Sequence, residues 1–123
     1  MSPANRELVE EFARMFYVER DVAGAFMRFV APDYVQHNPS ILDGRDAAIA
    51  ALRDKFASPD AGFEIQRILV DGDLAVVHVK ATRVGAPDAA VADFYRLSDG
   101  LLVEHWDVLQ SVPDDAVNPA PMF

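Results

Sequence analysis

Residues 91–110 read VADFYRLSDGLLVEHWDVLQ and decide the fold of the C-terminal half of the chain. Two runs rich in β-branched, aromatic and leucine side chains flank the pair Asp99-Gly100. Aspartate followed by glycine between two such runs is the typical signal of a tight turn, so the stretch predicts an antiparallel β-hairpin. Because successive side chains of a strand point to opposite faces, the turn also decides which side chains meet across the hairpin.

Two turn lengths are compatible with this hairpin. A two-residue turn would place Asp93 opposite Trp106. A three-residue loop that ends on a left-handed glycine would pair Leu97 with Leu101 and place Asp93 opposite His105. We favour the three-residue loop, because it gathers most of the apolar side chains on one face of the hairpin.

In the favoured register, three titratable side chains lie at one end of an otherwise apolar face. Asp93 lies opposite His105, and Asp107 lies opposite Val91. The other residues on this face are Tyr95, Leu97, Leu101, Val103 and Leu109. The second face carries Ala92, Phe94, Arg96, Leu102, Glu104, Trp106, Val108 and Gln110.

Two carboxylates and an imidazole on an apolar face require an explanation, because a buried charge is costly without a partner. A carboxylate in apolar surroundings, beside a second carboxylate, can act as a general base near neutral pH. The alternative is structural: Asp93 and His105 form a cross-strand pair, and Asp107 lies at a solvated edge of the sheet. The pattern alone leaves both interpretations open.

The N-terminal half predicts three helices. The first begins at Ser2, whose hydroxyl group caps it, and proline follows at the first helical position. Asp21 caps a second, shorter helix that Pro32 ends, and residues 44–57 form a third. Proline, asparagine and glycine interrupt residues 31–43, which we expect to be irregular.

The C-terminal half predicts strands. Two β-rich runs at residues 63–70 and 74–84, joined by an Asp-Gly turn, precede the hairpin. Helices followed by such a meander indicate an α+β domain, with the helices packed on one face of a curved antiparallel sheet. We expect residues 1–123 to form one domain, with residues 113–123 as an extended, proline-containing tail.

Composition narrows the function classes. The 123 residues are 51% hydrophobic and carry a formal net charge of −9, which is typical of a globular protein and unsuited to phosphate backbones or anionic lipid. We therefore expect no nucleic-acid partner and no membrane partner. Since the N-terminus has no apolar run like that of a signal peptide, we also expect a cytoplasmic location.

The lack of cysteine excludes disulfides, thiolate metal sites and cysteine nucleophiles. The three histidines show no metal-ligand spacing, so we expect no zinc site.

Several short motifs resemble one known family. They are YVQHNP at residues 34–39, DGR at 43–45, DGD at 71–73, VVH at 76–78, DFYR at 93–96 and EHWDVLQ at 104–110. Over nearly the whole chain, the sequence resembles the SnoaL-like polyketide cyclase family of the nuclear-transport-factor-2-like superfamily. The resemblance implies a cone-shaped, curved antiparallel sheet wrapped around three N-terminal helices, a deep apolar pocket inside the cone, and usually a homodimer.

The same resemblance implies a reaction. Characterised members close a polyketide ring by intramolecular aldol condensation without metal or cofactor, and an aspartate near the end of the last strand removes the α-proton. Asp107 best matches that aspartate. The position that matches the neighbouring histidine of those cyclases is Asp93 here, and His105 on the same face would take over the role of that histidine.

An enolising cyclase, isomerase or lyase is therefore our leading hypothesis, with no cofactor and with a small hydrophobic carbonyl-containing or aromatic compound as its ligand. Asp107 is the expected base, His105 orients it or donates to the developing oxyanion, and Asp93 fixes the imidazole tautomer. The expected ligand contacts are four polar side chains of the pocket: Tyr34, His37, His78 and Tyr95.

Two other functions fit the same residues. Limonene-type epoxide hydrolases of this superfamily activate water with two aspartates bridged by an arginine, and Asp93 and Asp107 could supply the carboxylates. Arg96, however, falls on the other face of the hairpin in the favoured register. The third interpretation is a non-catalytic dimeric domain whose pocket holds a ligand and whose interface includes Phe94 and Trp106 on the outer face.

Overall fold

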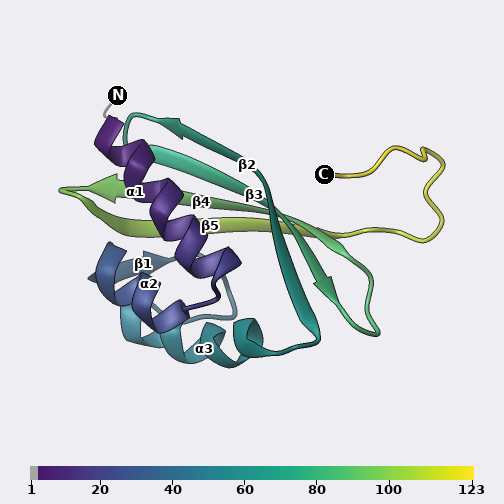
Figure 1. The fold of residues 1–123 in the computed structure, drawn as a ribbon, viewed down its shortest axis with the longest axis horizontal. Coiled ribbons are helices and arrows are strands. Elements are labelled where there is room, and N and C mark those ends of the chain that lie inside the picture. The colour runs from purple at the N-terminus through teal and green to yellow at the C-terminus, as the bar shows by residue number, and fades with distance from the viewer. Residues whose placement is uncertain (1–2) are drawn as a thin grey trace.

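The computed structural model describes residues 3–123 (Figure 1). The helices are α1 (Pro3–Ala13), α2 (Val22–Phe29) and α3 (Arg45–Ala57), and a π-helical segment, η1 (Arg14–Val18), continues α1. The strands are β1 (Val30–Gln36), β2 (Ala61–Asp71), β3 (Leu74–Arg83), β4 (Ala89–Ser98) and β5 (Leu101–Ser111). The predicted α+β class is confirmed, and β1 is an addition to the predicted strands. The expected helix cap at Ser2 lies outside the described residues.

The sheet is mixed because of β1. The strand order is β1-β5-β4-β3-β2, in which β1 runs parallel to β5 and every other neighbouring pair is antiparallel. The prediction that residues 31–43 are irregular is therefore wrong for their first part. Pro32 is tolerated there because β1 is an edge strand whose register shifts between Val30 and Val35, where a missing N–H interrupts no regular ladder.

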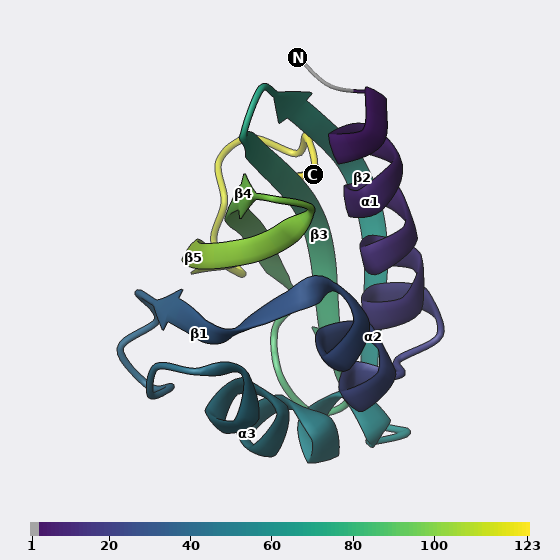
Figure 2. The same ribbon diagram turned by 90° about the vertical axis from the view of Figure 1, so that its left-hand side faces the viewer.

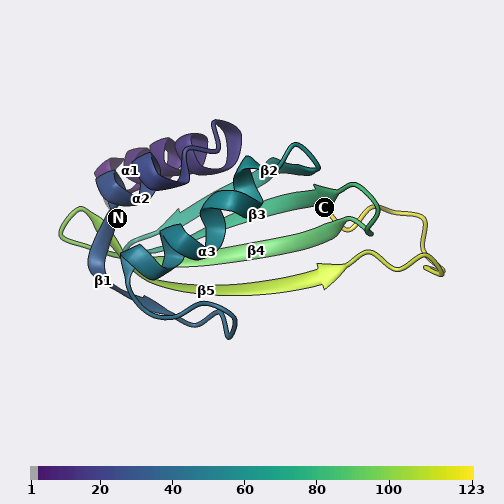
Figure 3. The same ribbon diagram turned by 90° about the horizontal axis from the view of Figure 1, so that it is seen from below.

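The helices cover one face of the sheet. Figures 2 and 3 show α1, α2 and α3 on the same side of the curved strands. Asp21 caps α2 as predicted, because its side chain accepts a hydrogen bond of 3.0 Å from the backbone N–H of Gly24. The core between helices and sheet includes Phe12, Phe16, Phe26, Phe29, Val77, Val79, Tyr95 and Leu102. None of the helices in the described residues is long and apolar enough to cross a membrane.

The β4–β5 hairpin combines a two-residue turn with a bulge. The turn residues Asp99 and Gly100 have φ angles of 52° and 76°, and two successive positive values are typical of a type I′ turn. The register then shifts between Arg96 and Leu97, where Val103 on β5 is left without a partner. The predicted three-residue loop is therefore wrong.

Turn and bulge together displace the register by two residues from the predicted one. Asp93 pairs with Asp107, and Tyr95 pairs with His105. Because the displacement is even, the three titratable side chains still share one face, as predicted. Nearer the turn the prediction fails, since Leu102, which it assigns to the outer face, is fully buried.

Residues 113–123 form a largely exposed tail without helix or strand. Figure 1 shows this yellow segment leaving β5, extending beyond the strand ends and turning back. The ring of Phe123 lies 5.1 Å from Lys80 Nζ on β3, so the end of the chain returns to the sheet.

Candidate active site

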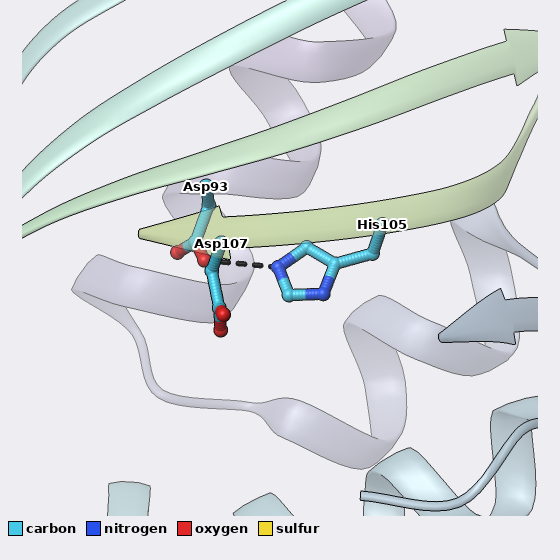
Figure 4. Close-up of side chains that lie close together, drawn as sticks. All are labelled: Asp93, His105 and Asp107. Carbon is cyan, nitrogen blue, oxygen red and sulfur yellow. Dashed lines mark hydrogen bonds and ion pairs between the residues drawn. The ribbon is translucent and has the colours of Figure 1, made fainter. Parts of the chain in front are cut away.

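Three titratable side chains meet on the inner face of the sheet. Asp93 lies on β4, and His105 and Asp107 lie on β5. Figure 4 shows the two carboxylates side by side, with the imidazole ring turned toward them. One nitrogen or oxygen atom from each of the three side chains lies within 4.8 Å of the others. The structure thus brings together the three residues that the sequence singled out for catalysis.

Both carboxylate oxygens of Asp93 take part in hydrogen bonds. His105 Nε2 lies 2.9 Å from Oδ1, and the Tyr17 hydroxyl donates to Oδ2 at 2.6 Å. Tyr17 belongs to the π-helical segment, in which the N–H of Glu19 donates to the carbonyl of Arg14, five residues earlier. Only 8% of Asp93 is exposed, so these two hydrogen bonds replace the water that the carboxylate gives up on burial.

The hydrogen-bond network places a proton on one of the two imidazole nitrogens of His105. Gln36 Oε1 accepts from the backbone N–H of Asn38 at 3.0 Å, so it must also be the acceptor for His105 Nδ1 at 2.6 Å. Nδ1 therefore carries a proton. A second proton lies in the bond between Nε2 and Asp93, held by the imidazole or by the carboxyl group. Asp93 and His105 form a pair that is neutral as a whole.

Asp107 is the less constrained carboxylate. Asn38 Nδ2 donates to Asp107 Oδ2 at 2.7 Å, and this amide is oriented because Asn38 Oδ1 accepts from the N–H of Ser40 at 2.9 Å. Within residues 3–123, Oδ1 of Asp107 has no hydrogen-bond partner. The side chain is half-buried and lines a cavity, so this oxygen is available to a ligand.

The cavity has a volume of about 350 Å³ and lies between the helices and the inner face of the sheet. Its polar wall residues are Tyr17, Tyr34, Gln36, Asn38, Ser40, Lys55, Asp93, Tyr95, His105 and Asp107. Its apolar wall residues are Phe16, Phe26, Ile41, Ala51, Leu52, Phe56, Phe63, Val79, Ala81, Val91 and Leu109. A wall that combines apolar and aromatic side chains with convergent polar groups is typical of a small-molecule site.

The cavity wall contains all three tyrosines of the chain, and their environment keeps them protonated. Burial, followed by the negative charge of Asp93, raises the pKa of Tyr17, Tyr34 and Tyr95 well above the ordinary value of 10.0. The hydroxyls of Tyr17 and Tyr95 are 2.7 Å apart, and Tyr95 is the donor because Tyr17 gives its one proton to Asp93. The Tyr34 hydroxyl has no partner among the described residues and can donate to a ligand.

His78 lies outside the cavity, which corrects one expected ligand contact. Its strand neighbours Val77 and Val79 are buried in the core, so the alternation of the strand turns His78 to the outer face. There His78 Nδ1 accepts a hydrogen bond of 2.8 Å from Arg67 Nη1.

His37 also faces outward, which corrects a second expected contact. Its Nε2 lies 2.6 Å from a carboxylate oxygen of Glu104, and its ring stacks on Trp106 with the ring centres 4.9 Å apart. Arg96 Nε donates to the other oxygen of Glu104 at 2.8 Å. The bonds from His37 and Arg96 lower the pKa of Glu104, and they hold Arg96 on the outer face, where the sequence places it.

Three wall residues supply hydrogen bonds that the sequence does not predict: Tyr17, Gln36 and Asn38. The available signal for two of them is strand alternation, because Gln36 and Asn38 flank the outward-facing His37 and so face inward. Tyr17 carries no comparable signal, since its position depends on the π-helical turn.

A cation would find ligand atoms in the same three titratable residues, Asp93, His105 and Asp107. The hydrogen bond between Asp93 Oδ1 and His105 Nε2 already uses two of the candidate atoms. A metal ion that used these two atoms would have to replace this bond.

Fold and site together define a class of protein: an α+β domain that encloses a small-molecule cavity with two unequal carboxylates in its wall. The model of the SnoaL-like domain matches residues 9–105, and the chain belongs to this family. The family includes polyketide cyclases. A search of curated proteins gives no match.

Solved structures share the fold over most of their length. A nuclear-transport-factor-2-like protein of unknown function from Mesorhizobium loti is 20% identical, with a TM-score of 0.77, over 89% of this chain and 93% of that chain. A candidate SnoaL-like polyketide cyclase from Jannaschia sp. CCS1 is 21% identical, with a TM-score of 0.70, over 89% of both chains. AclR, a candidate hydroxylase from Streptomyces galilaeus, is 21% identical, with a TM-score of 0.69, over 91% and 83%. At these identities the likeness shows the fold alone.

The tyrosines predict how the protein responds to alkaline pH. Because the fold raises each tyrosine pKa above its unfolded value of about 10, their contribution to stability is complete below that pH and is lost as the pH rises further. Phenolate absorbance and loss of far-ultraviolet circular dichroism should therefore appear together in one transition above pH 10. In Tyr34→Phe the absorbance change should shrink in proportion and remain coincident with unfolding. Phenolate that forms before the circular dichroism changes would contradict the buried network.

Proposed function

We propose that the protein is a cofactor-independent cyclase or isomerase that enolises a carbonyl substrate in its cavity, with Asp107 as the base. The observation that carries this proposal is the unequal bonding of the two carboxylates. Both oxygens of Asp93 are hydrogen-bonded, whereas Asp107 keeps one oxygen open to the cavity. A general base must reach the proton of the substrate, and Asp107 can do so without breaking a bond.

In the proposed step, Asp107 Oδ1 takes the α-proton of a ketone or β-keto ester, and the electron pair of the C–H bond forms the C=C bond of an enolate. The negative charge moves to the carbonyl oxygen, to which the Tyr34 hydroxyl donates a hydrogen bond. In a cyclisation, the enolate carbon attacks a second carbonyl of the same substrate. The new alkoxide then takes the proton from Asp107, which restores the carboxylate.

His105 acts in this proposal as a positioning residue. Both of its ring nitrogens are engaged, by Asp93 and by Gln36, so neither is free to donate to an enolate. Its effect is electrostatic, because the proton that it shares with Asp93 offsets the charge of that carboxylate and so reduces its repulsion of Asp107 and of the enolate. Of the two roles expected for His105, orienting the base network is the better supported.

The epoxide-hydrolase alternative has less support. It needs an arginine between the two aspartates, but Arg96 is bonded to Glu104 on the outer face. Among the described wall residues, none is an arginine. The remaining alternative is a domain that binds a ligand without catalysis. Ligand binding without any α-proton exchange would favour it.

Replacing Asp107 with asparagine removes the base and keeps the size of the side chain. We expect α-proton exchange in heavy water, followed by NMR over a panel of cyclic ketones and β-keto esters, to fall by at least about a hundredfold. Asp114→Asn, on the exposed tail, is the matched control and should exchange at the wild-type rate. Undiminished exchange by Asp107→Asn would exclude this residue as the base.

Tyr34→Phe tests the proposed donor to the enolate oxygen. Loss of the free hydroxyl should lower the exchange rate by about a hundredfold, because one hydrogen-bond donor to the developing charge is removed. Tyr95→Phe is the matched control, since its hydroxyl is already bonded to Tyr17, and it should have the smaller effect. The proposal fails for Tyr34 if both variants slow exchange equally or if neither does.

A further inference from the structure

The two lysines of the chain differ in their surroundings. Lys80 on β3 lies 3.9 Å from a carboxylate oxygen of Glu64 and 5.1 Å from the ring centre of Phe123. Lys55 lies on α3, is exposed, and lines the cavity. Over residues 3–123, no ion pair or hydrogen bond engages the Lys55 ammonium group, so it is available to a ligand.

The helix around Lys55 supplies no partner for it. On a helix, side chains interact with those three and four positions away; on the N-terminal side of Lys55 these are Ala51 and Leu52, and on the other side α3 ends at Ala57, before Ser58 and Pro59. None of the four is acidic. Ala51 and Leu52 also line the cavity, so Lys55 stands on the side of α3 that borders it.

Lys55 is the one permanently cationic side chain among the described residues of the cavity wall. The pair of Asp93 and His105 is neutral as a whole, and Asp107 contributes a negative charge. A protein with a net charge of −9 disfavours anionic ligands unless a local cation compensates. The unpaired Lys55 in this wall therefore contributes to ligand specificity, because it favours a ligand that carries a negatively charged group.

The size and lining of the cavity limit the rest of the ligand. A cavity of roughly 150 Å³ lined by apolar side chains holds one benzene molecule. The volume of about 350 Å³ is therefore suited to about two rings. Phe56 is stacked between Phe16 and Phe63, with ring centres 4.3 and 4.0 Å apart, and this aromatic wall suits a flat ligand.

We propose that the site takes a one- or two-ring carbonyl compound that carries a carboxylate group, and that Lys55 binds this carboxylate. That the ligand contains a carbonyl group is inferred from the proposed function. That it carries an acid group is inferred from Lys55, and its number of rings is inferred from the volume of the cavity. An ammonium–carboxylate hydrogen bond is stronger than one between neutral groups, so it discriminates between an acid and its neutral analogue.

Calorimetric titration with 2-naphthoate and with the neutral 2-naphthamide tests the proposal. The wild-type protein should bind the acid more tightly than the amide. Lys55→Met keeps an apolar side chain of similar length and should weaken naphthoate binding by about tenfold or more, with naphthamide binding unchanged. Lys80→Met removes the other lysine and should leave both affinities unchanged.

Several results would overturn the proposal. They are equal wild-type affinities for acid and amide, no binding of either compound, an equal loss of both ligands in Lys55→Met, or an equal effect of Lys80→Met. Neither probe has an α-proton, so the test is independent of enolisation. Charge-dependent binding at Lys55 together with no α-proton exchange on any carbonyl compound would refute the proposed function and leave the acid specificity standing.

Discussion

The hydrogen bond between Asp93 Oδ1 and His105 Nε2 is the contact on which the rest of the site depends. The two residues are 8% and 6% exposed, and a buried carboxylate that lost its partner would be strongly destabilising. The bond joins side chains that are not directly opposite each other, since Tyr95 pairs with His105 and Asp93 pairs with Asp107. After the two-residue turn, it is the bulge in β5 that brings Asp93 and His105 to the same face, so the geometry of the cavity depends on one irregularity of the sheet.

From this bond the network extends in both directions and makes the two carboxylates unequal. On one side, Tyr95 donates to Tyr17 and Tyr17 donates to Asp93, which leaves that carboxylate fully engaged. On the other side, the edge strand β1 and the loop after it supply Gln36 to His105 and Asn38 to Asp107. Asp93 thus serves to hold the imidazole, whereas Asp107 is held by one oxygen and presents the other to the cavity.

Much of this architecture follows from the sequence, and the failures have physical causes. Alternation in the last hairpin places the three titratable residues on one face, and it does so even though the predicted register is wrong, because the two errors add to an even shift. The bulge was not predictable, since no proline or glycine marks Val103. Strand β1 is not predicted, because Pro32 indicates irregular structure. The inward positions of Gln36 and Asn38 can be inferred only when β1 is known to be a strand. The outward position of His78 was readable from its apolar neighbours Val77 and Val79.

The most direct test of the network is the protonation of His105 Nδ1, measured by NMR of the uniformly ¹⁵N-labelled protein. The nitrogen chemical shifts and the couplings to the ring protons distinguish a protonated Nδ1 from one that carries a lone pair. We expect a protonated Nδ1 at neutral pH, because the oxygen of Gln36 can only accept. His105→Gln identifies the signal by its disappearance. An Nδ1 without a proton would mean that the imidazole is not held between Gln36 and Asp93, and it would contradict the proposed division of roles between the two carboxylates.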